Sequence, residues 1–132
     1  MDIVGTGIDI VECLRIAQMI ERHGELFITR VYTDAEIEYC TARKAATQHY
    51  SGRWAAKEAV LKALGTGWAQ GTAFRQVEVV RGDGGAPGVK LHDIAAARAT
   101  ALGVRRIHLS ITHERGFAAA VAVLESGGRD ER

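Results

Sequence analysis

The sequence has few of the residues that mark secreted, fibrous or membrane-spanning proteins. Only two cysteines and one proline occur among 132 residues, and aromatic side chains make up 6%. Two cysteines are too few for a disulfide-built fold, and nothing has the CxxC spacing of a metal-binding pair. No run approaches the roughly 20 apolar residues that a membrane-spanning helix needs. The first residues, with an acid at Asp2, also lack the basic and apolar segments of a secretory signal.

The sequence also has almost no excess of charge of either sign. Seventeen Lys and Arg face sixteen Asp and Glu, for a net charge of +1, whereas a general nucleic-acid binder shows a larger basic excess. Apolar residues at 47% and charged residues at 25% are typical of a folded globular protein. We expect one domain over residues 1–125 and a polar tail over 126–132. Cys13 and Cys40 lie in apolar helical patterns, which favours buried thiols over a disulfide and a cytoplasmic or other reducing compartment.

Hydrophobic periodicity predicts an α+β fold in which a mostly antiparallel sheet packs with helices. The expected strands cover residues 3–9, 74–80, 89–91, 105–112 and 117–124. The expected helices run from Cys13 to a stop at Gly24, from about 34, from 48 to 64, and from 93 to 102. Thr33 and Glu36 have the spacing of a capping box, which places the second helix start. Glycine at 116 fits a hairpin between the last two strands.

Three segments carry polar residues where the local pattern calls for apolar ones. In the first, Asp9 lies among Ile and Val at the end of a predicted strand, where a carboxylate is costly to bury without a partner. One interpretation makes Asp9 the N-cap of the following helix. The other makes it a ligand of a hard cation such as Mg²⁺.

The second segment is the strongest predicted helix. Helical spacing puts Glu58 and Lys62 on one face with Trp54, and Arg53 and Lys57 beside them. A surface pair between Glu58 and Lys62 is one interpretation. One acid among several bases on a face with apolar neighbours also fits a Mg²⁺–polyphosphate ligand.

The third segment is a strand in which His108, Ser110 and Thr112 alternate with apolar residues and His113 follows. Its polar face is expected to meet either solvent or a ligand.

Together these segments resemble the holo-[acyl-carrier-protein] synthase family of 4′-phosphopantetheinyl transferases. The matching stretches are GIDIVECLRI at 7–16, FITRVYTDAEI at 27–37, GRWAAKEAVLKALGTG at 52–67 and HLSITHERGFAAAVAVLE at 108–125. The resemblance implies an enzyme that moves the phosphopantetheine arm of coenzyme A (CoA) to a serine of an apo acyl-carrier protein for fatty-acid synthesis. The released product is adenosine 3′,5′-bisphosphate.

The resemblance also implies roles for individual residues. Asp9 and Glu58 would bind Mg²⁺, Glu58 would take the serine proton directly or through a metal-held water, and Lys62 would neutralise or protonate the leaving phosphate. The residues expected to bind CoA are Arg53, Lys57, Gly65, Thr66, Gly67, His108 and His113. The residues expected to dock an acidic carrier protein are Arg15, Arg22 and Arg30.

Members of this family are trimers with the site between protomers. The resemblance therefore implies that a neighbour covers apolar strand faces such as those of Phe117, Ala119 and Val121. Two alternatives remain open from the sequence. The acceptor could be a carrier of a polyketide or peptide synthase, or the chain could be a non-catalytic CoA-binding module, although retention of Asp9, Glu58 and Lys62 counts against the latter. A long glycine-rich loop at 82–88 departs from the family pattern.

Overall fold

The computed structural model describes residues 1–66 and 73–127, except for the side chain of Asp83. It confirms an α+β fold with antiparallel sheets. The main sheet has the order β1-β5-β4, and β2 and β3 form a separate hairpin sheet. The strands are β1 (Ile3–Glu12), β2 (Val77–Arg81), β3 (Pro87–Leu91), β4 (Val104–His113) and β5 (Phe117–Ser126). The helices are α1 (Cys13–His23), α2 (Glu25–Val31), α3 (Asp34–Thr41), α4 (Ala46–Leu64) and α5 (Asp93–Leu102).

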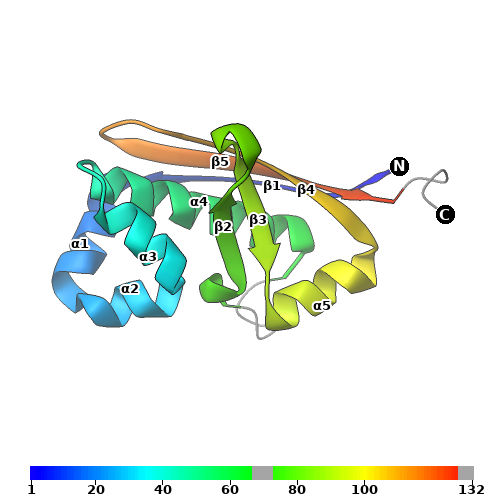
Figure 1. Ribbon diagram of the computed structural model, residues 1–132, viewed down its shortest axis with the longest axis horizontal. Coiled ribbons are helices and arrows are strands. Elements are labelled where there is room, and N and C mark those ends of the chain that lie inside the picture. The colour runs from blue at the N-terminus through cyan, green and yellow to red at the C-terminus, as the bar shows by residue number, and fades with distance from the viewer. Residues whose placement is uncertain (67–72, 128–132) are drawn as a thin grey trace.

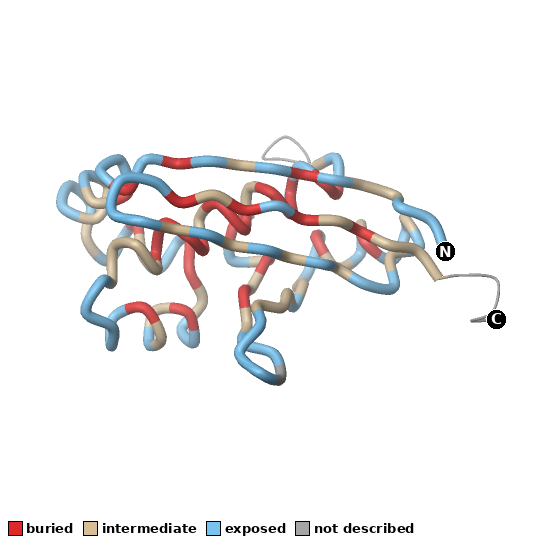
Figure 2. The backbone as a smooth tube through the Cα atoms, turned by 90° about the horizontal axis from the view of Figure 1, so that it is seen from above, coloured by how far each residue is buried: buried red, intermediate tan, exposed pale blue. Residues whose placement is uncertain are grey.

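The described helices all lie on one side of the main sheet (Figure 1). Seen from the other side, the three strands lie open, and exposed residues alternate along them with buried or partly buried ones (Figure 2). Ile8 and Ile10 of β1 are 69% and 66% exposed, and Phe117 and Val121 of β5 are also exposed. The sheet therefore has a helix-covered face and a bare apolar face.

The long helix α4 packs against β1 at backbone distance. A Cβ atom on Gly7 would lie 1.9 Å from the carbonyl oxygen of Ala59, and one on Gly5 would lie 2.1 Å from that of Ala63. Only glycine leaves room for this approach. The contact fixes how α4 sits relative to the next helix-facing residue of β1, which is Asp9.

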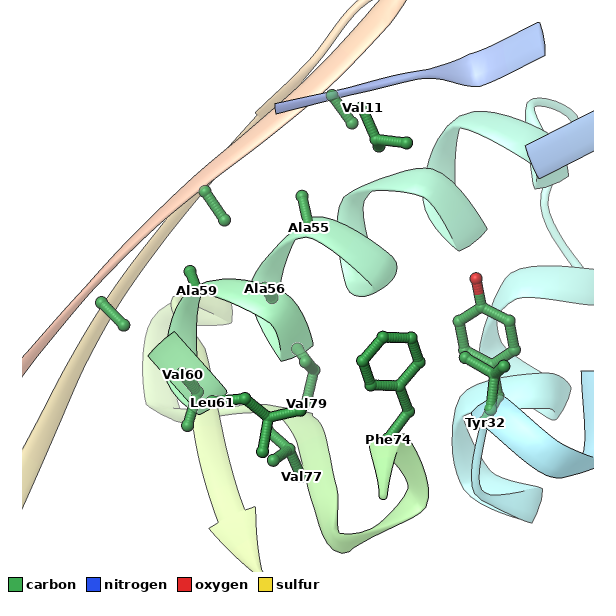
Figure 3. Close-up of a cluster of buried hydrophobic side chains, with 14 of the residues drawn as sticks. Val11, Tyr32, Ala55, Ala56, Ala59, Val60, Leu61, Phe74, Val77 and Val79 are labelled. Atoms are coloured by element: carbon green, nitrogen blue, oxygen red, sulfur yellow. The ribbon is translucent and has the colours of Figure 1, made fainter. Parts of the chain in front are cut away.

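The core surrounds α4, which packs against the main sheet on one side and against the second sheet and the N-terminal helices on the other (Figure 3). Fully buried side chains there include Tyr32, Val60, Phe74 and Val77. Most of α4 is enclosed, since twelve of its residues are buried. The helix that carries the predicted site is therefore fixed by packing on several sides.

The two ends of the described chain lie together at one end of the main sheet (Figure 1). The backbone N–H of Ser126 donates to the carbonyl of Asp2 at 2.8 Å, and the Asp2 N–H donates to the Ser126 hydroxyl at 3.2 Å. No helix in residues 1–66 or 73–127 is long and apolar enough to cross a membrane.

The structure confirms several expected elements and corrects others. The capping box of Thr33 and Glu36 is present, α5 has the expected bounds, and Cys13 and Cys40 are buried free thiols. Helix α2 was not expected: Gly24, at φ 53°, breaks the chain direction, and a second helix starts at once. The predicted strand at 74–80 begins instead with a 3₁₀ turn over Phe74–Gln76.

Candidate active site

Asp9 faces α4 from the middle of β1, and its side chain is 13% exposed. Strand β1 runs on to Glu12, longer than predicted, because it stays paired with β5 as far as Phe117. Glu12 precedes α1 and makes no side-chain cap. The interpretation of Asp9 as a helix N-cap is therefore wrong, and its carboxylate is turned toward the helix-covered side of the sheet.

Glu58 on α4 forms the other half of an acidic pair. Burial raises the pKa of Glu58, and the nearby carboxylate of Asp9 raises it further, while Lys62 and Arg15 act in the opposite direction. Two like charges held close together on separate elements repel each other. A cation between them would remove that cost.

Lys62 lies one turn after Glu58 and links α4 to β1. Its ammonium is 3.1 Å from Asp9 Oδ1 and donates to the carbonyl of Ile8 at 3.0 Å. Its side chain is 52% exposed, so it can also meet a ligand from solvent. The surface-pair interpretation with Glu58 misses the contact to Asp9, which joins residues 53 positions apart.

The donor set of this site fits a hard divalent cation. Mg²⁺ prefers oxygen ligands and takes one or two protein carboxylates, with water and substrate phosphate oxygens in the other positions. Asp9 and Glu58 supply two carboxylates, and no group of three or more metal-binding side chains occurs among the described residues. The pair suits an ion shared with a phosphorylated ligand better than a closed structural site.

The C-terminal end of α4 supplies further polar groups. Gly65 ends the helix in the left-handed conformation with φ 71°, and the Thr66 N–H donates to Leu61. The hydroxyl oxygen of Thr66 is buried without a hydrogen-bond partner in this structure. Such a group is costly unless a ligand or water completes it. Gly67 lies outside the described residues.

The other residues predicted to bind CoA do not all lie on one side of the main sheet. Arg53 and His113 lie on the helix-covered side and line one cavity of about 150 Å³. His108 lies on the bare face, where its ring nitrogen is 2.9 Å from Glu125. Residues five apart on a strand point to opposite faces, so one protomer does not bring His108 to Asp9.

The predicted role of Lys57 is wrong. It was expected to contact CoA, but its side chain is fully buried and its ammonium lies 2.7 Å from Glu36. It also donates to the carbonyls of Phe74 and Val77. An ammonium has three donors, so all of them are used inside the core. Lys57 therefore holds α4, α3 and the start of β2 together and has no donor left for a coenzyme.

The three arginines expected to bind a carrier protein are exposed on the N-terminal helices. Arg15 and Arg22 lie on α1 and Arg30 on α2. Arg15 also lies over the Trp54 ring, 5.9 Å from its centroid, and lowers the pKa of Glu58. A cavity of about 390 Å³ opens beside Arg30 between α1, α2 and α4. Its apolar lining is Met19, Leu26, Phe27, Val31, Trp54 and Phe74.

A cluster that the sequence did not predict surrounds Tyr39. The guanidinium carbons of Arg43, Arg53 and Arg81 lie 3.4, 4.1 and 5.4 Å from the centroid of its ring. These residues come from separate parts of the chain. Only the spacing of four between Tyr39 and Arg43 could have signalled a contact.

Comparison with known proteins gives the family of this chain. The model of the 4′-phosphopantetheinyl transferase superfamily matches residues 5–122. The chain belongs to that superfamily. Within it, the chain is 49% identical over 123 residues to a holo-[acyl-carrier-protein] synthase of Koribacter versatilis, covering 93% of this chain and 98% of the relative. The transferase assignment confirms the family expected from the sequence motifs.

Solved structures of transferases with this fold support the same placement. A holo-[acyl-carrier-protein] synthase from Neisseria meningitidis superimposes with a TM-score of 0.86 at 29% identity, covering 95% of this chain and 100% of that one. One from Bacillus anthracis, in complex with CoA (3′,5′-ADP), has a TM-score of 0.77 at 37% identity and covers 95% and 98% of the two chains. The transferase fold thus occurs with a coenzyme A nucleotide bound in a relative.

Proposed function

We propose that this transferase moves 4′-phosphopantetheine from CoA to a serine of apo acyl-carrier protein and releases adenosine 3′,5′-bisphosphate. The observation that carries the proposal is the meeting of Asp9, Glu58 and Lys62 at the junction of β1 and α4. Two carboxylates can hold a divalent cation beside a pyrophosphate, and an ammonium can neutralise charge on the leaving group.

The residues divide the work of the transfer. Glu58, whose pKa is raised by burial and by Asp9, is the group that would take the proton of the attacking serine hydroxyl, either directly or through a water. The serine oxygen bonds to the β-phosphorus of CoA as the bond from that phosphorus to the bisphosphate oxygen breaks. Lys62, half exposed beside the acids, neutralises the negative charge that grows on the leaving oxygen.

Asp9 and Glu58 are the residues that would hold Mg²⁺. When bound, the ion supplies a Lewis-acidic charge next to the pyrophosphate oxygens. The repulsion between the two carboxylates supports this assignment, because a bound cation would remove that repulsion. Thr66, with its unpartnered hydroxyl, and Gly65 lie at the end of the same helix and are placed to bind the pantetheine portion.

We further propose a homotrimer in which each site is shared. His108 and Asp9 lie on opposite faces of the same sheet, so a site that uses both needs two chains. The bare face, with Ile8, Ile10 and Phe117 exposed, is the apolar surface that such assembly would bury.

Shared sites are tested by coexpressing two inactive variants, Asp9→Asn and His108→Ala. In a randomly assembled cyclic trimer, about a quarter of the sites combine an intact Asp9 from one chain with an intact His108 from its neighbour. Transfer activity should return to roughly that fraction. Failure to recover activity in a mixed trimer would contradict the shared site.

An acidic carrier is expected to dock on the exposed arginines of α1 and α2. Arg15, Arg22 and Arg30 form a basic strip although the whole chain is nearly neutral. Charge of one sign on a docking face speeds encounter with a partner of the other sign. The free thiols Cys13 and Cys40 fit a reducing cytoplasm, where fatty-acid carriers would be met.

The function is tested by intact-mass measurement of apo carrier protein incubated with CoA, Mg²⁺ and the enzyme. Wild type should add one phosphopantetheine, and Asp9→Asn and Glu58→Gln should lose at least about 100-fold in rate while staying folded. If only a carrier of a polyketide or peptide synthase were modified, the proposed acceptor would be wrong while the proposed transfer reaction would stand. CoA binding without modification of any carrier would favour a non-catalytic binding module.

A further inference from the structure

A side chain from α5 reaches the C-terminal end of α4, the helix that carries most of the candidate site. The Arg98 Nε–H donates to the carbonyl of Leu64, the last residue of α4, at 3.0 Å. The last carbonyls of a helix have no partner within the helix. The N–H groups of Gly65 and Thr66 donate back to carbonyls of the last helical turn. Arg98 adds a further partner at this end from a segment 34 positions along the chain.

The charge and the anchorage of Arg98 suit this contact. The aligned peptide dipoles give the C-terminal end of a helix a partial negative charge, which a cation stabilises. Helix α5 is held in place by burial of Ala95 and Ala99 and by a 2.9 Å hydrogen bond from the Ala95 N–H to the Gln76 side chain. Arg98 therefore binds the end of α4 from a packed element.

The guanidinium of Arg98 also lies against the turn that follows α4. Gly65 has φ 71°, in the left-handed region, and a Cβ atom there would lie 3.5 Å from Arg98 Nη2. The next residue, Thr66, has a buried hydroxyl oxygen without a hydrogen-bond partner among the described residues. The conformation of Gly65 sets the direction in which the chain carries this hydroxyl. A contact that restrains Gly65 therefore restrains Thr66 as well.

The end of α4 is held from two sides. Lys62, in its last turn, reaches β1 through the carboxylate of Asp9 at 3.1 Å. Arg98 holds the same end to α5. The first contact belongs to the centre at which the pyrophosphate is proposed to react. The second lies at the turn of Gly65 and Thr66, to which the proposed function assigns the pantetheine portion of CoA.

We propose that Arg98 is a positioning residue, which holds the turn of Gly65 and Thr66 in the conformation that receives the phosphopantetheine portion of CoA. The inference rests on the proposed function, which assigns this turn to that portion. Without the contact, only part of the population would hold the turn in this conformation, and CoA would bind more weakly in proportion. Arg98 then determines the affinity for the part of CoA that is transferred and not for the part that is released.

The test compares by calorimetry the binding of CoA and of adenosine 3′,5′-bisphosphate, which lacks the phosphopantetheine portion. In Arg98→Met, which keeps most of the aliphatic stem, the dissociation constant of CoA should rise at least about tenfold. That of the bisphosphate should change by less than about twofold. Arg98→Lys keeps a charge and a donor for Leu64, so it should lose less affinity for CoA and guards against a folding defect in Arg98→Met.

The matched control is Arg75→Met. Arg75 donates to the Thr29 carbonyl of α2 at 2.7 Å, so this variant also removes a contact between a guanidinium and a helix carbonyl, but outside the candidate site. It should retain both affinities. A selective loss of CoA affinity in Arg75→Met would show that the effect is not particular to the end of α4 and would overturn the proposal.

The other outcomes separate this proposal from the proposed function. Equal weakening of both ligands in Arg98→Met and Arg98→Lys would show a general structural role and overturn the positioning role. Unchanged CoA affinity in Arg98→Met would overturn it too. A wild-type protein that binds CoA but modifies no carrier would overturn the proposed function instead, and the two dissociation constants would still test Arg98.

Discussion

The ammonium of Lys57 and the carboxylate of Glu36 form a fully buried ion pair with Nζ and Oε1 2.7 Å apart. The other Glu36 oxygen accepts from the Val79 N–H at 2.8 Å. Glu36 therefore caps α3 and also contacts α4 through Lys57 and β2 through the Val79 N–H. The neighbour of Lys57 in the sequence, Glu58, lies instead beside Asp9 at the candidate active site. Adjacent residues of α4 therefore have different roles, since Lys57 stabilises the fold and Glu58 belongs to the site.

Replacing Lys57 should destabilise the fold rather than disable the site directly. In Lys57→Met the Glu36 charge would stay buried without its partner, which costs about 3–5 kcal/mol of the free energy of unfolding. The matched control is Lys62→Met, half exposed, which should cost under about 1 kcal/mol yet abolish transfer. Urea unfolding and intact-mass assays on both variants check this. A stable Lys57→Met protein that had lost CoA binding would instead restore the original expectation for Lys57.

Filling the contact between β1 and α4 should be severely destabilising. In Gly7→Ala the new methyl would lie 1.9 Å from a backbone oxygen, which no side-chain rotation relieves. We expect a loss of at least about 3 kcal/mol, at the upper end for overpacking. Gly88→Ala is the control, because its nearest neighbour, a Val80 methyl, would be at 3.4 Å. Thermal melts of both variants measure the difference, and equal melting temperatures would contradict the close approach.

Much of this molecule follows from its sequence. The capping box of Thr33 and Glu36 and the hairpin at Gly116 predicted local structure correctly because each depends on residues close in the chain. The family resemblance implied that Asp9, Glu58 and Lys62 act in one site, but the direct contact between Lys62 and Asp9, which joins distant segments, was not predicted. The error at Lys57 has a physical cause. Helix α4 is buried on several sides, so helical periodicity gave no indication which of its basic residues would face the core.

The missed helix α2 and the Tyr39 cluster show a different limit. A seven-residue helix after Gly24 is stabilised by burial of Phe27 and Val31 rather than by its own propensity. The cluster depends on the hairpin β2–β3 reaching α3, a tertiary contact that no local pattern encodes.

The Glu78–His92 pair should make part of the stability depend on pH. Burial acts to raise the pKa of Glu78, but hydrogen bonds with His92 and Thr33 outweigh it and lower that pKa. A carboxyl group with a lowered folded-state pKa stabilises above its unfolded value of about 4.3, and this contribution is lost as pH falls below it. Wild type should therefore exceed Glu78→Gln in unfolding free energy at pH 7, with the gap narrowing as the pH falls below the unfolded-state pKa of about 4.3. A gap that is constant with pH would exclude this linkage.

Reversing charge on α1 should weaken carrier docking without touching the transfer step. Arg22→Glu should raise KM for the carrier by about tenfold at low salt and leave KM for CoA in place. The control, Lys90→Glu, changes an exposed base on β3, away from α1. Initial rates at two ionic strengths measure both effects. A similar change in Lys90→Glu would mean that total charge, not the strip, attracts the carrier.

The hydrogen bonds between Asp2 and Ser126 hold the first and last strands of the chain side by side at these residues. The same packing is therefore compatible with a different order of the segments along the chain. A short peptide joining the two ends, with a new opening in the glycine turn between β2 and β3, would keep every strand pairing of the main sheet intact. The same proximity brings any partner fused to either end to one pole of the molecule, far from the end of the sheet where α1 begins.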